Sequence, residues 1–351
     1  MHFVIIYEQD RSHSDPLFLR QASAPPFHLI LTVAVCFVSE IRYMARYIGT
    51  VAPGRNGRTA KASTRHRWVS MTPDRTLEKL DRDGYVILEG VIPVDQVPHV
   101  RESVASCLTA HFRAAEEQAD AVRAKGHRQG GAGIQALPGI INHTQAFVPY
   151  LTDSRLTYSV QSLFGDFHRI SGTSAIANHP GNDRGYWHSD WPYNQTNAAH
   201  IPAPYADVCV KLSTLWVLTE FSPTTGGTLV IPGSHRDSTN PSGGDGFDRE
   251  APHPDEIQIS AHEGSVILFD SRLWHCVATN HGDEPRYAMN FGYAPWWLNL
   301  QPQRVGSPDH TAMVVEPRGK PNETPLVPEA IFAKLPDDVK PLFRHWVNPH
   351  G

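Results

Sequence analysis

The stretch Gly264-Ser265-Val266-Ile267-Leu268-Phe269-Asp270 is a short apolar run that begins at a glycine and ends at an acidic residue. Its length and its content of valine, isoleucine and phenylalanine indicate a buried β-strand. Similar short runs recur on both sides, separated by turns rich in Gly, Pro, Asn and Asp, at residues 212–218, 228–231, 273–278 and 287–293. Many short strands with such turns predict a mainly β core that forms a sandwich or barrel.

Helical patterns lie upstream of this core. Residues 76–82, 96–124 and 154–164 have helical character, with a short strand at 84–88. We therefore expect a mainly β fold with flanking helices (α+β), formed by a single domain over residues 71–351 with its core at about 168–300. A Gly/Ser-rich and Pro-rich segment at 240–254 is expected to be a surface excursion and is a candidate active-site lid.

The first 70 residues differ from the rest of the 351-residue chain, because they carry nine Lys/Arg and four Asp/Glu, whereas the whole chain has a net charge of −5. We expect a leader that is disordered or stems from a mis-assigned start, with organelle targeting as the alternative. The longest apolar run there, residues 29–38, is shorter than the roughly 20 residues of a membrane span. A cytoplasmic protein without a membrane span is expected, and the acidic balance argues against a nucleic-acid partner.

The four cysteines are scattered without a CxxC pair, which argues against a disulfide framework and a thiolate zinc site. The 20 histidines are more informative. Non-haem iron oxygenases bind their metal through two histidines and one carboxylate. The common sequence form is His-x-Asp on a strand, since residues i and i+2 point to the same face.

Five His-x-Asp triplets occur, so context has to choose among them. Four have unfavourable surroundings, in the leader, in turns or between prolines, and they begin at His13, His235, His253 and His281. The fifth, His188 and Asp190, lies in the aromatic stretch Gly185-Tyr186-Trp187-His188-Ser189-Asp190-Trp191. We expect this stretch to be a strand that lines a pocket.

His275 is the best later histidine, because it follows the buried strand at 264–270. The turn at residues 280–285 then reverses the chain toward Arg286. A symmetric hairpin would make His275 and Arg286 direct cross-strand partners. An Arg beside a metal would present a bidentate grip for the carboxylate of a dicarboxylate co-substrate.

Taken singly, these residues have simpler explanations. A lone strand histidine is usually a core or surface residue, and a lone Arg after a turn is usually solvated. Cys276 would alternate to the opposite face from His275, so we expect it in the core. Asp207 and Lys211 are expected to be structural polar residues. Candidates for substrate contact are the aromatic residues Trp187, Trp191, Tyr193 and Trp216.

Three motifs together resemble the phytanoyl-CoA dioxygenase family over about residues 77–300. They are His188-Ser189-Asp190-Trp191, Gly226-Gly227-Thr228-Leu229-Val230-Ile231-Pro232-Gly233-Ser234-His235, and Trp274-His275 followed by Arg286. The resemblance implies a double-stranded β-helix (jelly roll, cupin-like). It also implies Fe(II), 2-oxoglutarate as co-substrate, O2, and ascorbate as the reductant in vitro.

The same resemblance implies residue roles. It assigns His188, Asp190 and His275 to the metal, Arg286 to the distal carboxylate of 2-oxoglutarate, and Thr228 to co-substrate binding. Many relatives carry a hydroxyl two residues after the distal histidine, where this chain has Val277. A second partner for that carboxylate must therefore come from elsewhere.

The implied activity is a dioxygenase that hydroxylates an unactivated C–H bond of a small-molecule substrate and releases succinate and CO2. Related halogenases lack the carboxylate ligand, so the presence of Asp190 favours oxidation. Two alternatives stay open: a non-oxidative metal enzyme on a similar barrel, and a catalytically silent binding protein. The sequence does not define the substrate or the oligomeric state.

Overall fold

A computed structural model describes residues 73–127, 131–194, 201–241, 247–298, 305–321 and 323–347. The expected leader, residues 1–70, lies outside these ranges, as do residues 242–246 of the expected lid. No helix within the described ranges is long and apolar enough to cross a membrane.

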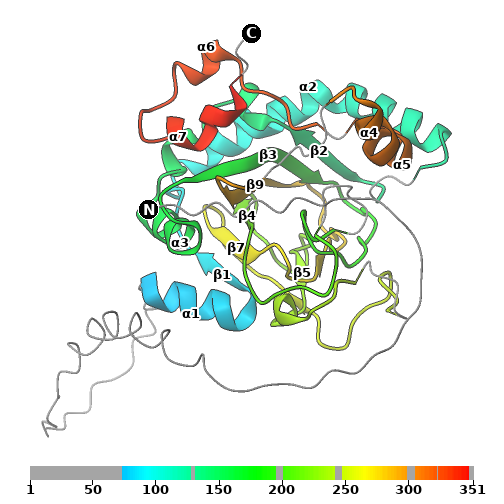
Figure 1. Ribbon diagram of the computed structural model, residues 1–351, viewed down its shortest axis with the longest axis horizontal. Coiled ribbons are helices and arrows are strands. Elements are labelled where there is room, and N and C mark those ends of the chain that lie inside the picture. The colour runs from blue at the N-terminus through cyan, green and yellow to red at the C-terminus, as the bar shows by residue number, and fades with distance from the viewer. Residues whose placement is uncertain are drawn as a thin grey trace, which may run out of the picture. The chain divides into compact units, whose positions relative to one another are not determined.

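Two antiparallel sheets form the centre of the fold (Figure 1). The larger has six strands in the order β1-β7-β4-β9-β3-β2 and the smaller has three in the order β6-β5-β8. The strands of the larger sheet are, in that order, β1 (Tyr85–Leu88), β7 (Val266–Asp270), β4 (Leu212–Val217), β9 (Arg286–Pro295), β3 (His168–Asn178) and β2 (Ile134–Pro138). Those of the smaller sheet are β6 (Ile257–Gln258), β5 (Leu229–Val230) and β8 (His275–Cys276). The expected mainly β, jelly-roll class with flanking helices is confirmed.

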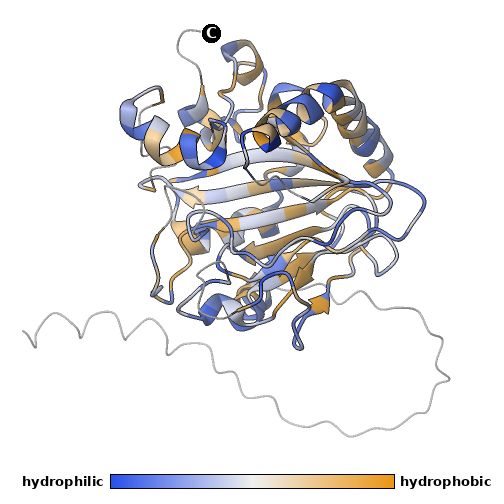
Figure 2. Cartoon of the chain, turned by 90° about the vertical axis from the view of Figure 1, so that its right-hand side faces the viewer, coloured by the Kyte–Doolittle hydropathy of each residue, from blue (hydrophilic) through white to orange (hydrophobic). Residues whose placement is uncertain are grey.

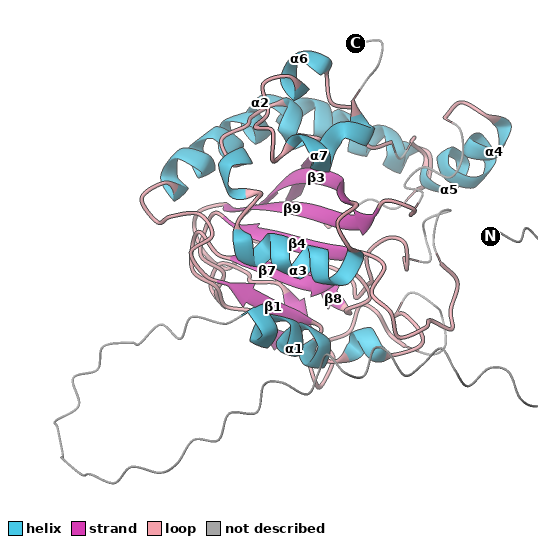
Figure 3. Ribbon diagram, turned by 60° about the vertical axis from the view of Figure 1, so that its left-hand side comes forward, coloured by secondary structure: helices cyan, strands magenta, loops and turns pink. Residues whose placement is uncertain are grey.

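Three longer helices pack outside the large sheet: α1 (Pro73–Asp83), α2 (Val97–Ala124) and α3 (Ser154–Phe164). Figure 3 shows α3 lying in front of the large sheet. Asp153 caps this helix by accepting the backbone N–H of Arg155 at 2.9 Å, and the helix ends at Gly165, whose φ is 76°.

Short helical segments complete the structure. They are η1 (Ile140–Asn142), η2 (Val148–Tyr150), η3 (Ser234–Arg236), α4 (Pro308–His310), the π-helix η4 (Thr311–Val315), α5 (Glu316–Arg318), α6 (Glu329–Phe332), α7 (Lys340–Phe343) and η5 (Arg344–Trp346).

Each face of the large sheet has its own apolar core. Side chains such as Trp216, Leu268 and Phe291 meet the flanking helices, where α2 contributes Val100 and Val104. In Figure 2 the helices on this side carry hydrophilic as well as hydrophobic residues, as expected for elements with one face in solvent. The opposite face of the sheet is turned toward the small sheet.

A second core fills the space between the two sheets. It includes Leu215, Ile267 and Ala288 from the large sheet and Val230 from the small one. Because side chains alternate along a strand, the neighbours of these residues at i±2 also project into this space. Arg286 and Thr228, two of the functional candidates, are such neighbours of Ala288 and Val230.

The sequence pattern did not reveal strands β2, β3 and β6. β3 is eleven residues long, but it mixes histidine, arginine, serine, glycine and asparagine with apolar residues and therefore has no apolar run. Its pairing along β9, interrupted by a register shift between Ile170 and Gly172, makes it a strand. Tertiary pairing here outweighs weak local propensity.

Candidate metal centre

His188 and His275 are held together by reciprocal backbone hydrogen bonds. The N–H of His188 donates to the carbonyl of His275 at 3.1 Å, and the N–H of His275 donates back at 3.0 Å. The prediction of a strand at residues 185–191 is wrong. Within this stretch His188 forms only an isolated β-bridge. This single bridge is nevertheless sufficient to place the two imidazole rings 4.2 Å apart.

Asp190 is joined to the same segment of chain. Its backbone N–H donates to the carbonyl of Ser271 at 2.8 Å, and the Ser189 hydroxyl donates to the carbonyl of Arg272 at 3.0 Å. Residues 188–190 are therefore fixed against residues 271–275 by four hydrogen bonds in total. The fold thus brings together His-x-Asp and a histidine that is distant in sequence.

Hydrogen bonds set the tautomer of both rings. Nδ1 of His188 lies 3.0 Å from the carbonyl of Tyr186, and Nδ1 of His275 lies 2.8 Å from the carbonyl of Leu273. Because a carbonyl only accepts, each Nδ1 carries a hydrogen, and Nε2 is the ring atom that can serve as a metal ligand. Both Nε2 atoms face Oδ1 of Asp190, at 3.9 Å for His188 and 3.5 Å for His275.

The three ligand atoms of His188, Asp190 and His275 lie within 4.8 Å of one another. Burial, followed by the neighbouring His275, lowers the pKa of His188 to about 4, so its ring is neutral at pH 7. Two imidazoles and one carboxylate are a donor set that suits Fe(II). These residues therefore fit the metal that the sequence implies.

The second oxygen of Asp190 is occupied by the protein. The Ser213 hydroxyl donates to Oδ2 of Asp190 at 2.5 Å, and Nζ of Lys211 lies 3.7 Å from the same atom. The hydroxyl of Ser271 lies 2.9 Å from that of Ser213. Burial alone would raise the pKa of Asp190, but Lys211 and His275 outweigh it and lower that pKa, so the side chain is a carboxylate.

Lys211 was expected to be a structural polar residue, and the structure places it beside Asp190. It is buried, with 9% of its surface exposed. The one sequence signal was a lysine between Val210 and Leu212 at the start of a buried strand. Asp207, by contrast, forms ion pairs with Arg236 and Arg272 and so keeps the structural role expected of it.

The expected cross-strand pairing of Arg286 with His275 is wrong. Arg286 lies opposite Asn178 of β3 in the large sheet, whereas His275 pairs with Val230 of β5 in the small sheet. The turn between them carries the chain from one sheet to the other. Asn280 fixes this crossing, because its amide donates to the carbonyl of Asn178 at 3.0 Å.

Arg286 nonetheless projects into the space between the sheets, as Ala288 two residues later does. Its guanidinium lies 4.1 Å from the ring centroid of Phe221. Nε of Arg286 and both polar atoms of the Asn178 side chain are buried without a hydrogen-bond partner among the described residues. Burial lowers the pKa of Arg286 to about 9. A buried cation beside an unpaired amide is a site that fits an anion.

Thr228 precedes β5 and is buried. It lies two residues before Val230, which packs between the sheets opposite His275, so Thr228 belongs to the same inward face. Cys276 lies on the other side, packed with Trp187 and Leu229, and burial raises the pKa of its thiol to about 12. Cys276 is therefore a core residue, as expected.

The Pro-Gly-Ser-His motif contacts the segment that carries His275. The Ser234 hydroxyl accepts the backbone N–H of Trp274 at 2.9 Å, and Nε2 of His235 lies 3.0 Å from the carbonyl of Asp81. Gly84, with φ of 81°, lies so close that a Cβ there would sit 2.5 Å from Nδ1 of His235. The motif thus joins helix α1 to the segment that carries His275.

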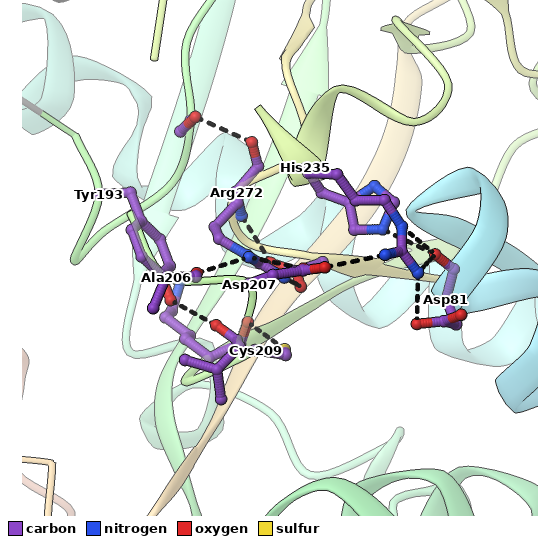
Figure 4. A network of polar contacts seen from close by, with 12 residues as sticks. Asp81, Tyr193, Ala206, Asp207, Cys209, His235 and Arg272 are labelled. Atoms are coloured by element: carbon purple, nitrogen blue, oxygen red, sulfur yellow. Dashed lines mark hydrogen bonds and ion pairs between the residues drawn. The ribbon is translucent and has the colours of Figure 1, made fainter. Parts of the chain in front are cut away.

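A network of ion pairs reinforces this support (Figure 4). Arg272 pairs with the buried Asp270 at 2.8 Å and with Asp207 at 3.2 Å. Asp207 also pairs with Arg236 at 2.8 Å, and Arg236 reaches Asp81 of α1. Arg272 is three residues before His275, so the network holds the loop that carries this candidate metal ligand.

Three of the four aromatic residues expected at the pocket wall lie in packed cores. Trp216 lies in the core against the helices, and its indole N–H donates to Thr214 at 3.1 Å. The indole N–H of Trp187 donates to the carbonyl of Ala251 at 3.0 Å. Tyr193 packs with Tyr205. The prediction that these three side chains line the pocket is wrong, because each ring is buried in an apolar cluster.

Comparison with known proteins identifies the family of this chain. The model of the family described as phytanoyl-CoA dioxygenase (PhyH) matches residues 80–288, which is more than half of the chain. Dioxygenase af480 of Aspergillus fumigatus is 31% identical over 134 residues, which cover 38% of this chain and 39% of that protein. Dioxygenase ALT11 of Alternaria alternata is 24% identical over 240 residues, which cover 64% of this chain and 73% of that protein.

The chain therefore spans less than half of the first of these relatives and about three quarters of the second. Among solved structures, apo EctD from S. alaskensis superposes with a TM-score of 0.49 at 24% identity. That superposition covers 69% of this chain and 85% of the EctD chain.

Proposed function

The chain belongs to the phytanoyl-CoA dioxygenase family, and on that premise we propose that it is an Fe(II)- and 2-oxoglutarate-dependent dioxygenase that hydroxylates an unactivated C–H bond of a small-molecule substrate. Succinate and CO2 are the expected co-products. One arrangement supports the proposal most strongly: the His188, Asp190 and His275 cluster and the buried cation Arg286 face the same space between the two sheets.

In this proposal His188, Asp190 and His275 hold the metal, and the bound iron with 2-oxoglutarate supplies the oxidising power for C–H cleavage. The carbonyls of Tyr186 and Leu273 would hold the hydrogen on each Nδ1 and orient each Nε2 toward the metal. Ser213 and Lys211 hold Oδ2 of Asp190, which leaves Oδ1 for the metal.

Arg286 and Asn178 would bind the distal carboxylate of 2-oxoglutarate. Arg286 supplies the positive charge, and the Asn178 amide supplies an N–H donor that no described residue uses. Asn178 would thus be the second partner of the distal carboxylate. Val277 cannot fill this role, because the valine side chain has no hydrogen-bond donor. The Phe221 ring excludes water from one face of the guanidinium, which strengthens its interaction with an anion. Thr228 is a further candidate contact on the inward face.

The test is the release of succinate and CO2 from 2-oxoglutarate under air, with Fe(II) and ascorbate, at high protein concentration. We expect slow turnover in the wild type and none in Asp190→Ala. Arg286→Met should retain metal binding but weaken 2-oxoglutarate binding by about 100-fold, because a charge-assisted pair is lost. Calorimetry with Zn(II) in place of iron measures both affinities without turnover.

The binding measurement separates the alternatives. Wild-type protein that binds the metal but not 2-oxoglutarate would overturn the proposal and favour a non-oxidative metal protein. Protein that binds neither would favour a catalytically silent family member.

A further inference from the structure

A polar pair lies in the middle of the large sheet, on the face that is turned toward the small sheet. Asn290 of β9 lies opposite Ser174 of β3. β9 is an interior strand, paired with β3 on one side and β4 on the other, yet both side chains are partly exposed. Ala288 and Gly292, the positions of β9 on either side of Asn290 along the same face, are buried. Solvent therefore reaches the space between the sheets at Asn290.

Contacts at both ends of β9 show that its even-numbered positions face inward, since alternate residues of a strand share one face. At one end the guanidinium of Arg286 lies 4.1 Å from the ring centroid of Phe221, which packs between the sheets. Toward the other end a Cβ on Gly292 would sit 2.8 Å from Cε of Lys211, a neighbour of the candidate metal centre. Asn290 lies between these two positions, so its side chain points into the same space.

The strand register sets Asn290 close to the candidate metal centre. Gly292 lies opposite Ser213 of β4, and the Ser213 hydroxyl donates to Oδ2 of Asp190 at 2.5 Å. Asn290 is two residues from Gly292, roughly 7 Å along the strand, and four residues from Arg286, roughly 13 Å. Because Gly292 has no side chain, Asn290 is the first side chain that β9 offers on the way from the metal centre to Arg286.

The two polar side chains are available to a ligand. The Asn290 amide forms no hydrogen bond with any group in the described ranges. The Ser174 hydroxyl lies 3.5 Å from the backbone carbonyl of Asn290, a distance at which a hydrogen bond is weak. Apolar residues flank the pair, because Leu215 lies opposite Asn290 on β4 and Ile176 follows Ser174 on the same face of β3. The amide and the hydroxyl thus form a small uncharged patch that can both donate and accept.

We propose that Asn290, with Ser174 beside it, determines specificity by binding an uncharged hydrogen-bonding group of the substrate, a carboxamide or lactam. The inference rests on the proposed function, because it takes the neighbouring metal centre as the oxidising centre. An amide matches Asn290 because it can donate to Oδ1 and accept from Nδ2 at the same time.

A charged group fits this place less well, since burying an ion without a partner of opposite charge is unfavourable. The two cations on the same side of the large sheet have other partners in the proposed function. Arg286 binds 2-oxoglutarate, and Lys211 lies 3.7 Å from Oδ2 of Asp190. Because Asn290 lies close to the metal centre, the carbon that is oxidised should be within a few bonds of the amide.

Ligand-observed NMR with three probes of similar size tests the inference. Full-length protein is loaded with Zn(II) and saturated with 2-oxoglutarate, so that Arg286 is occupied. It is then titrated with cyclohexanecarboxamide, cyclohexanecarboxylate and cyclohexylmethylammonium. We expect the wild type to bind the carboxamide about fivefold more tightly than either ion, the effect of one net hydrogen bond.

Two substitutions at the same position sharpen the test. Asn290→Leu should lose the preference for the carboxamide, because leucine neither donates nor accepts. Asn290→Asp should reverse the preference and favour the ammonium about tenfold, because a charge-assisted pair replaces a neutral one. Asn142→Asp is the matched control, since it introduces the same charge at an amide that donates to the carbonyl of Leu326. This control should rank the probes as the wild type does.

Equal binding of the three probes by the wild type, binding of none of them, or an Asn290→Asp variant that still prefers the carboxamide would overturn the inference. Calorimetry with 2-oxoglutarate separates it from the proposed function. Wild-type protein that does not bind 2-oxoglutarate refutes the proposed function, whereas normal 2-oxoglutarate binding without a preference for the carboxamide refutes only the role of Asn290. A 2-oxoglutarate affinity that falls more than about tenfold in Asn290→Leu would assign Asn290 to the co-substrate and also overturn the inference.

Discussion

Ser213 donates its hydroxyl hydrogen to Oδ2 of Asp190 at 2.5 Å, on the side of the carboxylate that faces away from His188 and His275. This bond leaves Oδ1 alone to face the two Nε2 atoms. Lys211 adds a positive charge 3.7 Å from the same Oδ2. We therefore propose that Ser213 and Lys211 are positioning residues, which leave Oδ1 of Asp190 available to a metal.

Ser213→Ala should lower the affinity for Fe(II) by about 10–100-fold, because Asp190 loses the bond that orients it. Titration with Fe(II) under nitrogen measures the effect. Ser265→Ala is the matched control, since Ser265 is also buried but its hydroxyl has no partner among the described residues. Equal metal affinity in the two variants would show that Ser213 does not orient Asp190.

Asn178→Ala should weaken 2-oxoglutarate binding about fivefold and leave metal affinity unchanged. The variant removes one neutral hydrogen bond to the carboxylate, which is worth about 1 kcal/mol, whereas the charge of Arg286 remains. Calorimetry with Zn(II)-loaded protein provides both constants. Asn142→Ala serves as control, since its amide donates to the carbonyl of Leu326 far along the chain. If the 2-oxoglutarate affinity of Asn178→Ala equals that of the wild type, Asn178 does not bind the co-substrate.

Arg272→Met should destabilise the protein by about 3–5 kcal/mol, because it leaves the buried carboxylate of Asp270 unpaired. The side chains of Arg272 and Asp270 are only 4% and 5% exposed. The Asp270→Asn, Arg272→Met double variant removes both charges and should recover part of this loss. Urea unfolding measures all three proteins, and a double variant no more stable than Arg272→Met would contradict this account.

His345 should make stability depend on pH. Burial, followed by the nearby charge of Arg169, lowers the pKa of His345 from 6.5 to about 4. As the pH falls below 6.5, the unfolded chain takes up a proton that the folded protein does not, so stability is lost down to about pH 4. This loss should reach about 2 kcal/mol between pH 8 and pH 5.

Urea midpoints at the two pH values test this expectation in wild type, His345→Gln and His99→Gln. The slope should flatten in His345→Gln and persist in His99→Gln, because His99 is exposed. A slope that is the same in all three proteins would assign the pH dependence to other groups.

The sequence by itself determined the fold class and the residue types of the candidate centre. Short apolar runs between turns are local features, and they predicted β4, β7 and β9 close to their observed bounds. His188, Asp190 and His275 were identified because metal chemistry needs particular side chains in a recognisable context. The structure brings these three side chains together, although residues 185–191 do not form the expected strand.

Tertiary structure alone decided which residues surround that centre. His275 and Arg286 are eleven residues apart but lie in different sheets, because β9 pairs with β3 and β4 rather than with β8. The same pairing sets Asn178 opposite Arg286, and the Lys125 side chain after α2 donates to the carbonyl of Gly319 after α5. Such contacts join residues tens to more than a hundred positions apart. They depend on backbone hydrogen bonds between strands and on the packing of whole helices and strands. A local sequence pattern specifies neither of these.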